Sequence, residues 1–241
     1  MILEDKILFT GGSGLLGGEI KKLIPNAYFP SHQEFDIENY SQMKEYLKGK
    51  EINQIIHAAA FTSPPKVEKD PIKGIDTNII GTSNVVKLAF ENNSKLIYIS
   101  TDYVFSGEKG NYSEEDALYP VNKYAWSKLG GECAVRMYDN SLIIRTSFGP
   151  NEFPYEKAFI DQWTSRESVS EISKKIINLL NKDVFGIIHL GGPRRTVFEY
   201  AKSLDKSKDI GKRSIKEMDL NFPKDTSLDS KKYNLLMGEI K

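Results

Sequence analysis

The chain has 241 residues, which is enough for one large α/β domain with a substantial core. Its 33 basic side chains balance 33 acidic ones, so no global field attracts nucleic acid or an anionic membrane, and neither partner is expected. The single cysteine excludes an intrachain disulfide, and no apolar run approaches the roughly 20 residues that span a bilayer, so we expect a cytoplasmic protein.

Short apolar runs suited to parallel strands recur along the chain. They lie at residues 6–10, 27–29, 54–60, 95–100, 141–147 and 186–192. Helical segments separate them, and the two clearest are expected to bury faces formed by Ile75, Ile79, Val86 and Phe90 and by Ile172, Ile176, Ile177 and Leu180.

This alternation predicts an α/β fold, a doubly wound parallel sheet of the Rossmann type with helices on both faces. We expect residues 1–150 to form the dinucleotide-binding core. Residues 151–241 are expected to form a reduced carboxyl-terminal substrate region, packed on that core in a single structural unit.

A glycine-rich turn, TGGSGLLGGEI, follows the first predicted strand at residues 10–20. Gly11 and Gly14 allow a sharp turn and close approach of a pyrophosphate to the backbone, and Gly17 allows the next helix to pack tightly on the strand. The pattern predicts a dinucleotide site that includes Leu15 and Leu16. A plain tight turn is the alternative.

The end of the second predicted strand indicates which dinucleotide is preferred. An acidic residue there would bind the ribose hydroxyls of NAD and repel a 2′-phosphate, whereas this chain carries Pro30, Ser31 and His32. NADP(H) is therefore favoured and NAD(H) is the alternative. Asp36, followed by Ile37, is a candidate for contact with the adenine.

Three side chains suggest carbonyl chemistry. Tyr124 and Lys128 lie four residues apart at the start of a predicted helix, so they share a face, and the ammonium would favour the ionised phenol. A phenol made more acidic in this way can serve as an acid or base near neutral pH. Thr101, at the carboxyl end of a strand, would orient the same substrate oxygen.

The motifs GGSGLLGG, HAAAFT (57–62), STDYVFSG (100–107), YPVNKYAWSKLGGE (119–132) and RTS (145–147) resemble the extended short-chain dehydrogenases/reductases. Within these, the chain is most similar to the dTDP-4-dehydrorhamnose reductase group of sugar-nucleotide enzymes. The resemblance covers residues 5 to 150 well, and DQW at 161–163 and HLGGPRR at 189–195 echo its later part.

The resemblance implies a reductase that transfers a hydride from the nicotinamide to a ketone of a nucleotide-activated sugar. Tyr124 would donate the proton, Lys128 would bind the nicotinamide ribose, and Thr101 would complete the catalytic set. The further cofactor candidates are Ala58, Ala59, Ala60, Thr62, Asn78 and Ser100. The further substrate candidates are Asp102, Val104, Phe105 and Arg194, the last through a diphosphate.

The chain departs from the family between RTS and DQW, where some twenty or more residues are missing. Two alternatives therefore stay open, a non-catalytic NADP-binding regulatory or partner subunit and an NAD-dependent sugar-nucleotide epimerase or dehydratase. An epimerase or a dehydratase needs an extra acid or base near the sugar ring, and Asp102 is the only carboxylate beside Thr101. The family resemblance also suggests a homodimer.

Several residues have simpler explanations. Asn78 could bond locally to backbone instead of relaying a proton, and Arg194 could be solvated at a helix start. Arg145 is expected to be ion-paired, Cys133 to lie in the core and Trp163 to pack a loop. The three histidines show no ligand spacing, so no metal site is expected.

Overall fold

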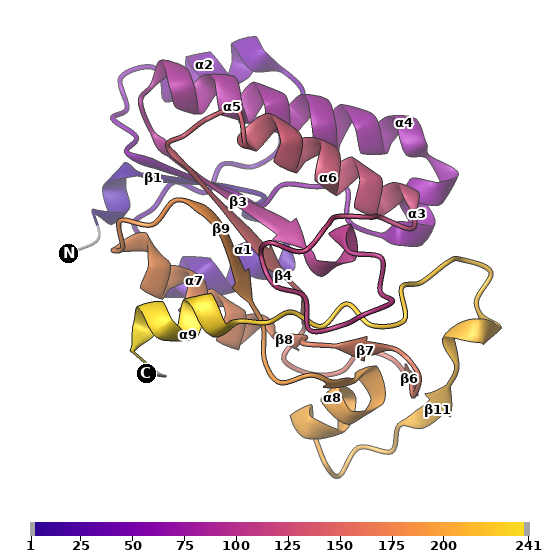
Figure 1. Cartoon of the computed structure of the whole chain (residues 1–241). Coiled ribbons are helices and arrows are strands. Elements are labelled where there is room, and N and C mark those ends of the chain that lie inside the picture. The colour runs from indigo at the N-terminus through magenta and orange to yellow at the C-terminus, as the bar shows by residue number, and fades with distance from the viewer. Residues whose placement is uncertain (1–2, 239–241) are drawn as a thin grey trace.

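The computed structural model describes residues 3–238. Within them, five strands form the central sheet in the order β1, β2, β3, β4, β9, and all neighbouring pairs are parallel (Figure 1). Their bounds are β1 Ile7–Thr10, β2 Gln54–His57, β3 Lys95–Thr101, β4 Ser141–Thr146 and β9 Gly186–Leu190. The predicted parallel α/β fold of the Rossmann type is confirmed.

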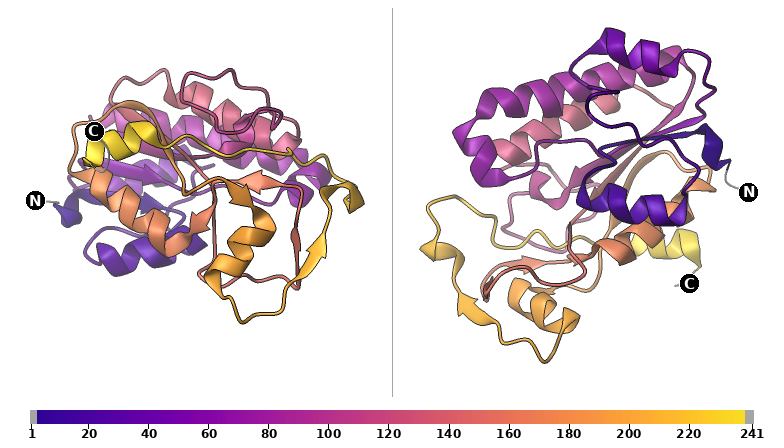
Figure 2. Two further views of the ribbon diagram at one scale, coloured as in Figure 1. Left: turned by 60° about the horizontal axis from the view of Figure 1, so that its bottom comes forward. Right: turned by 180° about the vertical axis from the view of Figure 1, so that it is seen from behind.

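Helices cover both faces of this sheet (Figures 1 and 2). One face is covered by α1 Leu15–Leu23, α7 Val169–Leu180 and α9 Lys231–Met237, the other by α2 Tyr40–Leu47, α5 Thr82–Glu91 and α6 Lys123–Val135. Successive strand residues alternate between the two cores, as Phe9 joins the first and Leu8 the second. The strands therefore read as continuous apolar runs.

Two predicted elements differ from the structure. The strand expected at residues 27–29 is reduced to one parallel bridge between Leu8 and Tyr28. The helix expected over residues 75–91 begins with a π-helical segment, η2 Ile75–Gly81, whose wider turns rotate the following α5. As a result Val85 is buried, whereas Phe90, expected in the buried face, is 71% exposed.

Residues beyond 150 contribute to the sheet and also build a small lobe. The lobe and its connections contain β5 Phe148–Gly149, β6 Lys157–Phe159, β7 Trp163–Thr164, β8 Glu167–Ser168, β10 Arg195–Thr196, α8 Val197–Leu204 and β11 Gly211–Arg213. Strands β6 and β11 pair in parallel, and α8 packs Val197 and Tyr200 into the lobe's own apolar core. Strand β9 pairs with β4 in the main sheet and α7 packs against that sheet, so residues beyond 150 also contribute to the core. The division of the chain at residue 150 stays a prediction.

The chain returns from the lobe along the front of the core as a strap, residues 223–228 (yellow in Figure 1). The strap is bound on both sides: Trp163 N donates to the Lys224 carbonyl at 2.7 Å, and Tyr112 N donates to the Ser227 carbonyl at 2.8 Å. It therefore connects the lobe to the loops that follow β3.

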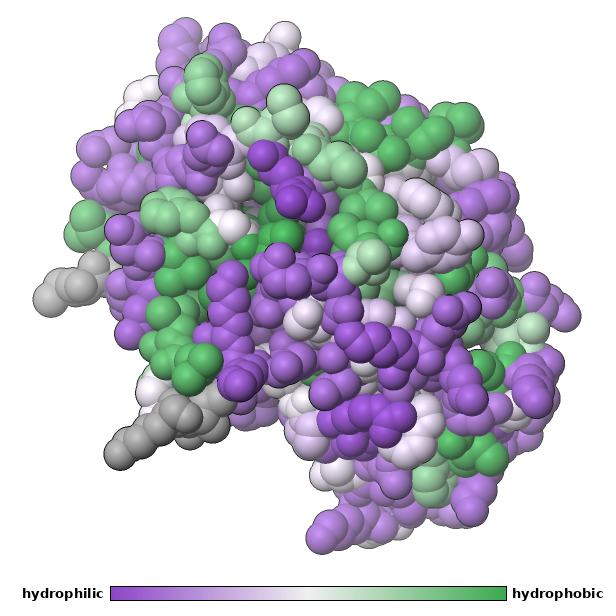
Figure 3. All heavy atoms as spheres, in the orientation of Figure 1, coloured by the Kyte–Doolittle hydropathy of each residue, from purple (hydrophilic) through white to green (hydrophobic). Residues whose placement is uncertain are grey.

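The remaining helices are short: α3 Pro64–Lys69, α4 Pro71–Gly74 and the 3₁₀ turns η1 Glu4–Lys6, η3 Asp102–Val104 and η4 Ile215–Glu217. Figure 3 shows a mainly hydrophilic face on which apolar side chains gather toward the side where α3 and α4 lie, and Ile72 and Ile75 are among the exposed apolar residues. None of the helices in residues 3–238 is long and apolar enough to cross a membrane. The homodimer stays a prediction.

Candidate functional site

A cavity of about 1380 Å³ runs along the carboxyl ends of the sheet strands and into the lobe. Its lining includes sixteen of the predicted site residues: Gly11, Gly14, Leu15, Leu16, His32, Asp36, Ile37, Ala58, Ala59, Ala60, Thr62, Ser100, Thr101, Asp102, Tyr124 and Lys128. The strand order reverses at β1, and crevices at such points are where doubly wound sheets bind ligands.

The glycine turn forms one end of this cavity. Gly11 has a φ of +80°, and a Cβ there would lie 2.8 Å from the backbone nitrogen of Ala59, so only glycine fits. Gly14 caps the start of α1 without a side chain, which leaves the first backbone N–H groups of that helix facing the cavity. This backbone surface fits a pyrophosphate at the helix terminus.

His57 supports the glycine turn through two hydrogen bonds that its ring makes. Its Nδ1 lies 2.7 Å from Thr10 Oγ1 and its Nε2 lies 3.0 Å from Thr82 Oγ1. Complete burial lowers the pKa of the imidazole to about 3, helped by the charge of Lys128. His57 is therefore a neutral connector between β1, β2 and α5.

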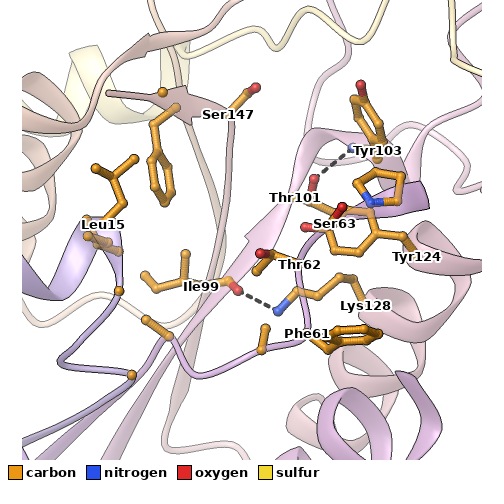
Figure 4. A pocket seen from close by; sticks show the side chains of 18 of the residues that line it. Leu15, Phe61, Thr62, Ser63, Ile99, Thr101, Tyr103, Tyr124, Lys128 and Ser147 are labelled. Atoms are coloured by element: carbon orange, nitrogen blue, oxygen red, sulfur yellow. Dashed lines mark hydrogen bonds between the residues drawn. The ribbon is translucent and has the colours of Figure 1, made fainter. Parts of the chain in front are cut away.

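Thr101, Tyr124 and Lys128 converge at the middle of the cavity (Figure 4). Asn122 caps α6 by accepting a hydrogen bond from Ala125 N at 2.9 Å, and the helix begins at Lys123, directly before Tyr124. Lys128 lies one turn further and donates from Nζ to the carbonyl of Ile99 at 2.9 Å. The expected spacing thus places both side chains on one face, opposite the end of β3.

Burial opposes charge on both members of this pair. It raises the pKa of Tyr124 above its ordinary value, although a hydrogen bond with Thr101 and the charge of Arg166 act against the rise. It lowers the pKa of Lys128 to about 7, against the attraction of Glu132. Lys128 is not among the causes of the pKa shift of Tyr124, and its acidification of this phenol stays a prediction.

Asp102 follows Thr101 and lines the same cavity. Its Oδ2 accepts a hydrogen bond of 2.5 Å from Thr226 of the strap, and its Oδ1 accepts one of 3.2 Å from Thr101. Burial raises the pKa of this carboxyl to about 6. Asp102 therefore joins the strap to the end of β3.

Two predicted substrate contacts are wrong. The side chains of Val104 and Phe105 are fully buried and lie outside the cavity lining. Phe105 stacks on Tyr112 with ring centroids 4.3 Å apart, and both belong to a small separate core. The 3₁₀ turn η3, which follows β3, directs these residues inward, and an apolar side chain gains more from the core than from a wet cavity.

Four other candidates also lie outside the cavity lining. A Cβ on Gly17 would lie 2.6 Å from Gly12 Cα, so this glycine serves helix packing. Ser31 donates to Glu34 from its N and Oγ atoms, at 2.9 and 2.8 Å, and turns away from the cavity. Asn78 accepts from Phe61 N and donates to the Phe61 carbonyl and to Ser127 Oγ, so it bonds a distant segment instead of the neighbouring backbone foreseen as its alternative.

Arg194 is the fourth of these residues, and its side chain is 43% exposed but ion-paired. Its Nη2 lies 2.7 Å from Asp225 Oδ2, and its guanidinium covers the ring of Trp163 at 4.0 Å. The expected packing role of Trp163 is confirmed. Cys133, expected in the core, is exposed on α6.

The sequence reading missed the lobe side of the cavity. Aromatic rings line it, with the Phe159–Phe222 and Phe153–Tyr155 pairs at centroid distances of 5.9 and 5.6 Å. Three cations, Lys157, Arg166 and Arg213, share this lining with one carboxylate, Glu156. The arginine directly after DQWTS could have signalled this side, because it precedes a predicted helix beside the shortened segment.

Arg166 is the cation that faces the catalytic end. Its Nε donates to Ser147 Oγ at 3.3 Å, and within residues 3–238 its guanidinium makes no ion pair. Its charge acts on Asp102, Tyr103 and Tyr124. By contrast, Arg145 is fully paired with Glu132, as expected. No group of three or more His, Cys, Asp or Glu residues in the described chain could hold a metal ion.

The chain resembles known proteins over most of its length. It is 31% identical over 198 residues to dTDP-4-dehydrorhamnose reductase of Aggregatibacter actinomycetemcomitans, an alignment that covers 78% of this chain and 62% of that protein. It is 26% identical over 239 residues to methionine adenosyltransferase 2 subunit beta of Rattus norvegicus, which covers 83% and 71% of the two chains.

A solved structure agrees with these matches. The chain superposes on dTDP-4-dehydrorhamnose reductase (rfbD) of Bacillus anthracis, solved in complex with NADP, with a TM-score of 0.87, 26% identity and coverage of 98% and 93%. The family model for the RmlD substrate binding domain matches residues 5–178. The chain therefore belongs to the RmlD substrate binding domain family.

Proposed function

We propose that this protein is an NADP(H)-dependent reductase of a nucleotide-activated keto-sugar. The observation that carries the proposal is the convergence of Thr101, Tyr124 and Lys128 in the cavity that begins at the glycine turn. The Aggregatibacter relative is named as a reductase of this class, although this chain spans only about 62% of its length.

The preference for NADP(H) is supported in two ways. The Bacillus anthracis reductase was solved with NADP, and no carboxylate stands at residues 30–32 of this chain to repel a 2′-phosphate. His32 lines the cavity there with a largely exposed ring. The backbone of Gly11 and Gly14 would hold the pyrophosphate, and Asp36 would face the adenine.

The chain's own residues then divide the reaction between them. A dihydronicotinamide held in this cavity would supply the hydride that the ketone carbon takes up. Tyr124 donates its phenolic proton to the ketone oxygen, so the carbonyl becomes an alcohol. Thr101 hydrogen-bonds the same oxygen and fixes its direction, and Lys128 binds the nicotinamide ribose beside Tyr124. The high pKa of Tyr124 keeps the phenol protonated and ready to donate.

We infer that Arg166 anchors the diphosphate of the substrate. Its unpaired guanidinium offers donors in a planar fork that matches phosphate oxygens. The aromatic pairs of the lobe lie along the same cavity and would stack on the nucleobase.

The test is an assay of NADPH and NADH oxidation with a panel of nucleoside-diphospho-4-keto-6-deoxy sugars. Tyr124→Phe removes only the proton donor, so turnover should fall by about a hundredfold or more while the NADPH Kd changes less than about twofold. Tyr119→Phe, at an exposed site before the same helix, is the control and should keep full turnover. Unchanged turnover in Tyr124→Phe would reject the assigned role.

The similarity to methionine adenosyltransferase 2 subunit beta favours a second candidate, a non-catalytic NADP-binding partner subunit. NADPH binding without turnover on any keto-sugar, together with a stable hetero-complex, would support it. An epimerase or dehydratase is less favoured, because the carboxylate of Asp102 is already bound by Thr226 and Thr101.

A further inference from the structure

A buried ion pair lies behind the catalytic helix, outside the cavity lining. Glu132 of α6 is fully buried and Arg145 of β4 is 1% exposed. Arg145 donates from Nη2 to Glu132 Oε2 at 2.9 Å and from Nε to Oε1 at 3.1 Å. Burying two charges costs several kcal/mol before their attraction is counted, so apolar residues would stabilise this position at least as well.

The pair is held by a row of side chains across the sheet. Ser100 and His189 are the cross-strand neighbours of Arg145 on β3 and β9. Ser100 Oγ donates to Glu132 Oε1 at 2.5 Å. His189 Nε2 accepts from Arg145 at 3.5 Å, while Nδ1 donates to the Tyr112 carbonyl at 3.0 Å. Three strands therefore fix the carboxylate of Glu132 in one place.

Lys128 lies one helical turn before Glu132 on α6. It is 3% exposed, and its hydrogen bond to the Ile99 carbonyl and its position 4.2 Å from the Tyr98 ring are contacts with neutral groups. A buried ammonium without a carboxylate nearby tends to lose its proton. Glu132, four residues further along α6, is the carboxylate whose charge acts on Lys128.

We propose that Glu132, fixed by Arg145, is a positioning residue that keeps the Lys128 ammonium in place and charged for binding the nicotinamide ribose. This inference rests on the proposed function, because it assigns Lys128 to the cofactor.

The other ionisable groups around Lys128 do not supply this charge. Burial keeps His57 neutral, with a pKa of about 3, and it holds Tyr98 and Tyr124 protonated by raising the pKa of each phenol. Asp102 has a pKa of about 6 and is bound to Thr226. Glu132 alone raises the pKa of Lys128, which burial has lowered to about 7.

The experiment measures NADPH binding by fluorescence between pH 5.5 and 9, without any sugar substrate. In the wild-type protein the affinity should fall as the pH rises through the region near 7, where Lys128 loses its charge. Glu132→Gln should move this fall to lower pH by about one unit or more. Glu68→Gln, which breaks the exposed pair with Lys123 at the start of the same helix, should leave it unmoved.

A second variant separates positioning from folding, because Glu132→Gln leaves Arg145 buried without a counter-ion. The double variant Glu132→Gln/Arg145→Gln should unfold at a higher temperature than the single variant and keep the shifted midpoint. A wild-type midpoint in either variant would overturn the inference. If NADPH binds at no pH, the proposed function fails instead.

Discussion

The two halves of the cavity are built in different ways. On the core side, Tyr124, Lys128 and the glycine turn stand on long parallel strands and capped helices, and hydrogen bonds from several strands fix them. On the lobe side, Arg166 and the aromatic pairs stand on strands of two or three residues and on loops. In the proposed function, the chemistry that needs precise geometry would use the rigid side, and substrate recognition would use the side built from short strands and loops.

The largest effect on this comparison is expected at the glycine turn. In Gly17→Ala the new Cβ would meet the backbone of Gly12 at 2.6 Å, which cannot move without displacing the pyrophosphate site. Overpacking of this kind costs about 1–3 kcal/mol, so the NADPH Kd should rise up to about a hundredfold in fluorescence titrations.

The neighbouring glycine is the matched control for this variant. A Cβ on Gly18 would meet nothing within 4 Å, so Gly18→Ala should keep cofactor affinity and gain up to about 1 kcal/mol of helix stability. Equal losses of NADPH affinity in both variants would show that any substitution in α1 weakens binding. The argument from close packing at Gly17 would then be wrong.

The sequence predicted the core side well because each of its features has a local cause. A glycine-rich turn after a strand and a four-residue spacing on a helix can both be read from neighbouring letters, as at Gly11 and at Tyr124 and Lys128. Val104 and Phe105 were misplaced because the direction of a side chain after a strand depends on a turn that the letters do not reveal. The π-helical start of the helix at Ile75 similarly shifted the buried face toward Val85.

The lobe side could not be predicted from its letters, since it depends on long-range pairing. Strand β6 finds its partner β11 more than fifty residues later, and only this pairing brings Phe159 near Phe222. Arg194 is a ligand candidate from the sequence, whereas Arg166 is not among the residues considered there. Asp225, which lies in the strap, pairs with Arg194, whereas Arg166 has no ion pair within residues 3–238.

This difference between the two arginines gives the second prediction. Arg166→Gln should raise the KM for the keto-sugar nucleotide roughly tenfold to 150-fold, since a hydrogen bond to a charged group contributes about 1.5–3 kcal/mol. The Kd for NADPH should hardly change, because Arg166 lies on the lobe side. Steady-state kinetics with the substrate found in the panel assay provides the measurement.

Arg194→Gln is the control for this second prediction. It removes an equal charge from the neighbouring loop, where the guanidinium is bound by Asp225, and the KM should stay within about twofold of wild type. If both variants raise the KM equally, the result would be explained by the loss of one positive charge from the lobe, and not by a direct bond between Arg166 and the diphosphate.

The smallest effect concerns the stability of the core side in acid. The folded-state pKa of His57, about 3, lies below the ordinary value of 6.5, so the unfolded chain takes up a proton first as the pH falls. Stability should therefore decrease from pH 6.5 to 5.5, by about 1 kcal/mol for this one group. His57→Gln should start less stable at pH 7 but lose about 1 kcal/mol less over the same interval in urea unfolding. The opposing contribution of Asp102, whose pKa is about 6, is common to both proteins and cancels in the difference.

His32→Gln is the control, because its ring is 75% exposed. Its free energy of unfolding should depend on pH as steeply as that of the wild type. A weaker dependence in this variant would mean that buried His57 is not the source of the acid sensitivity.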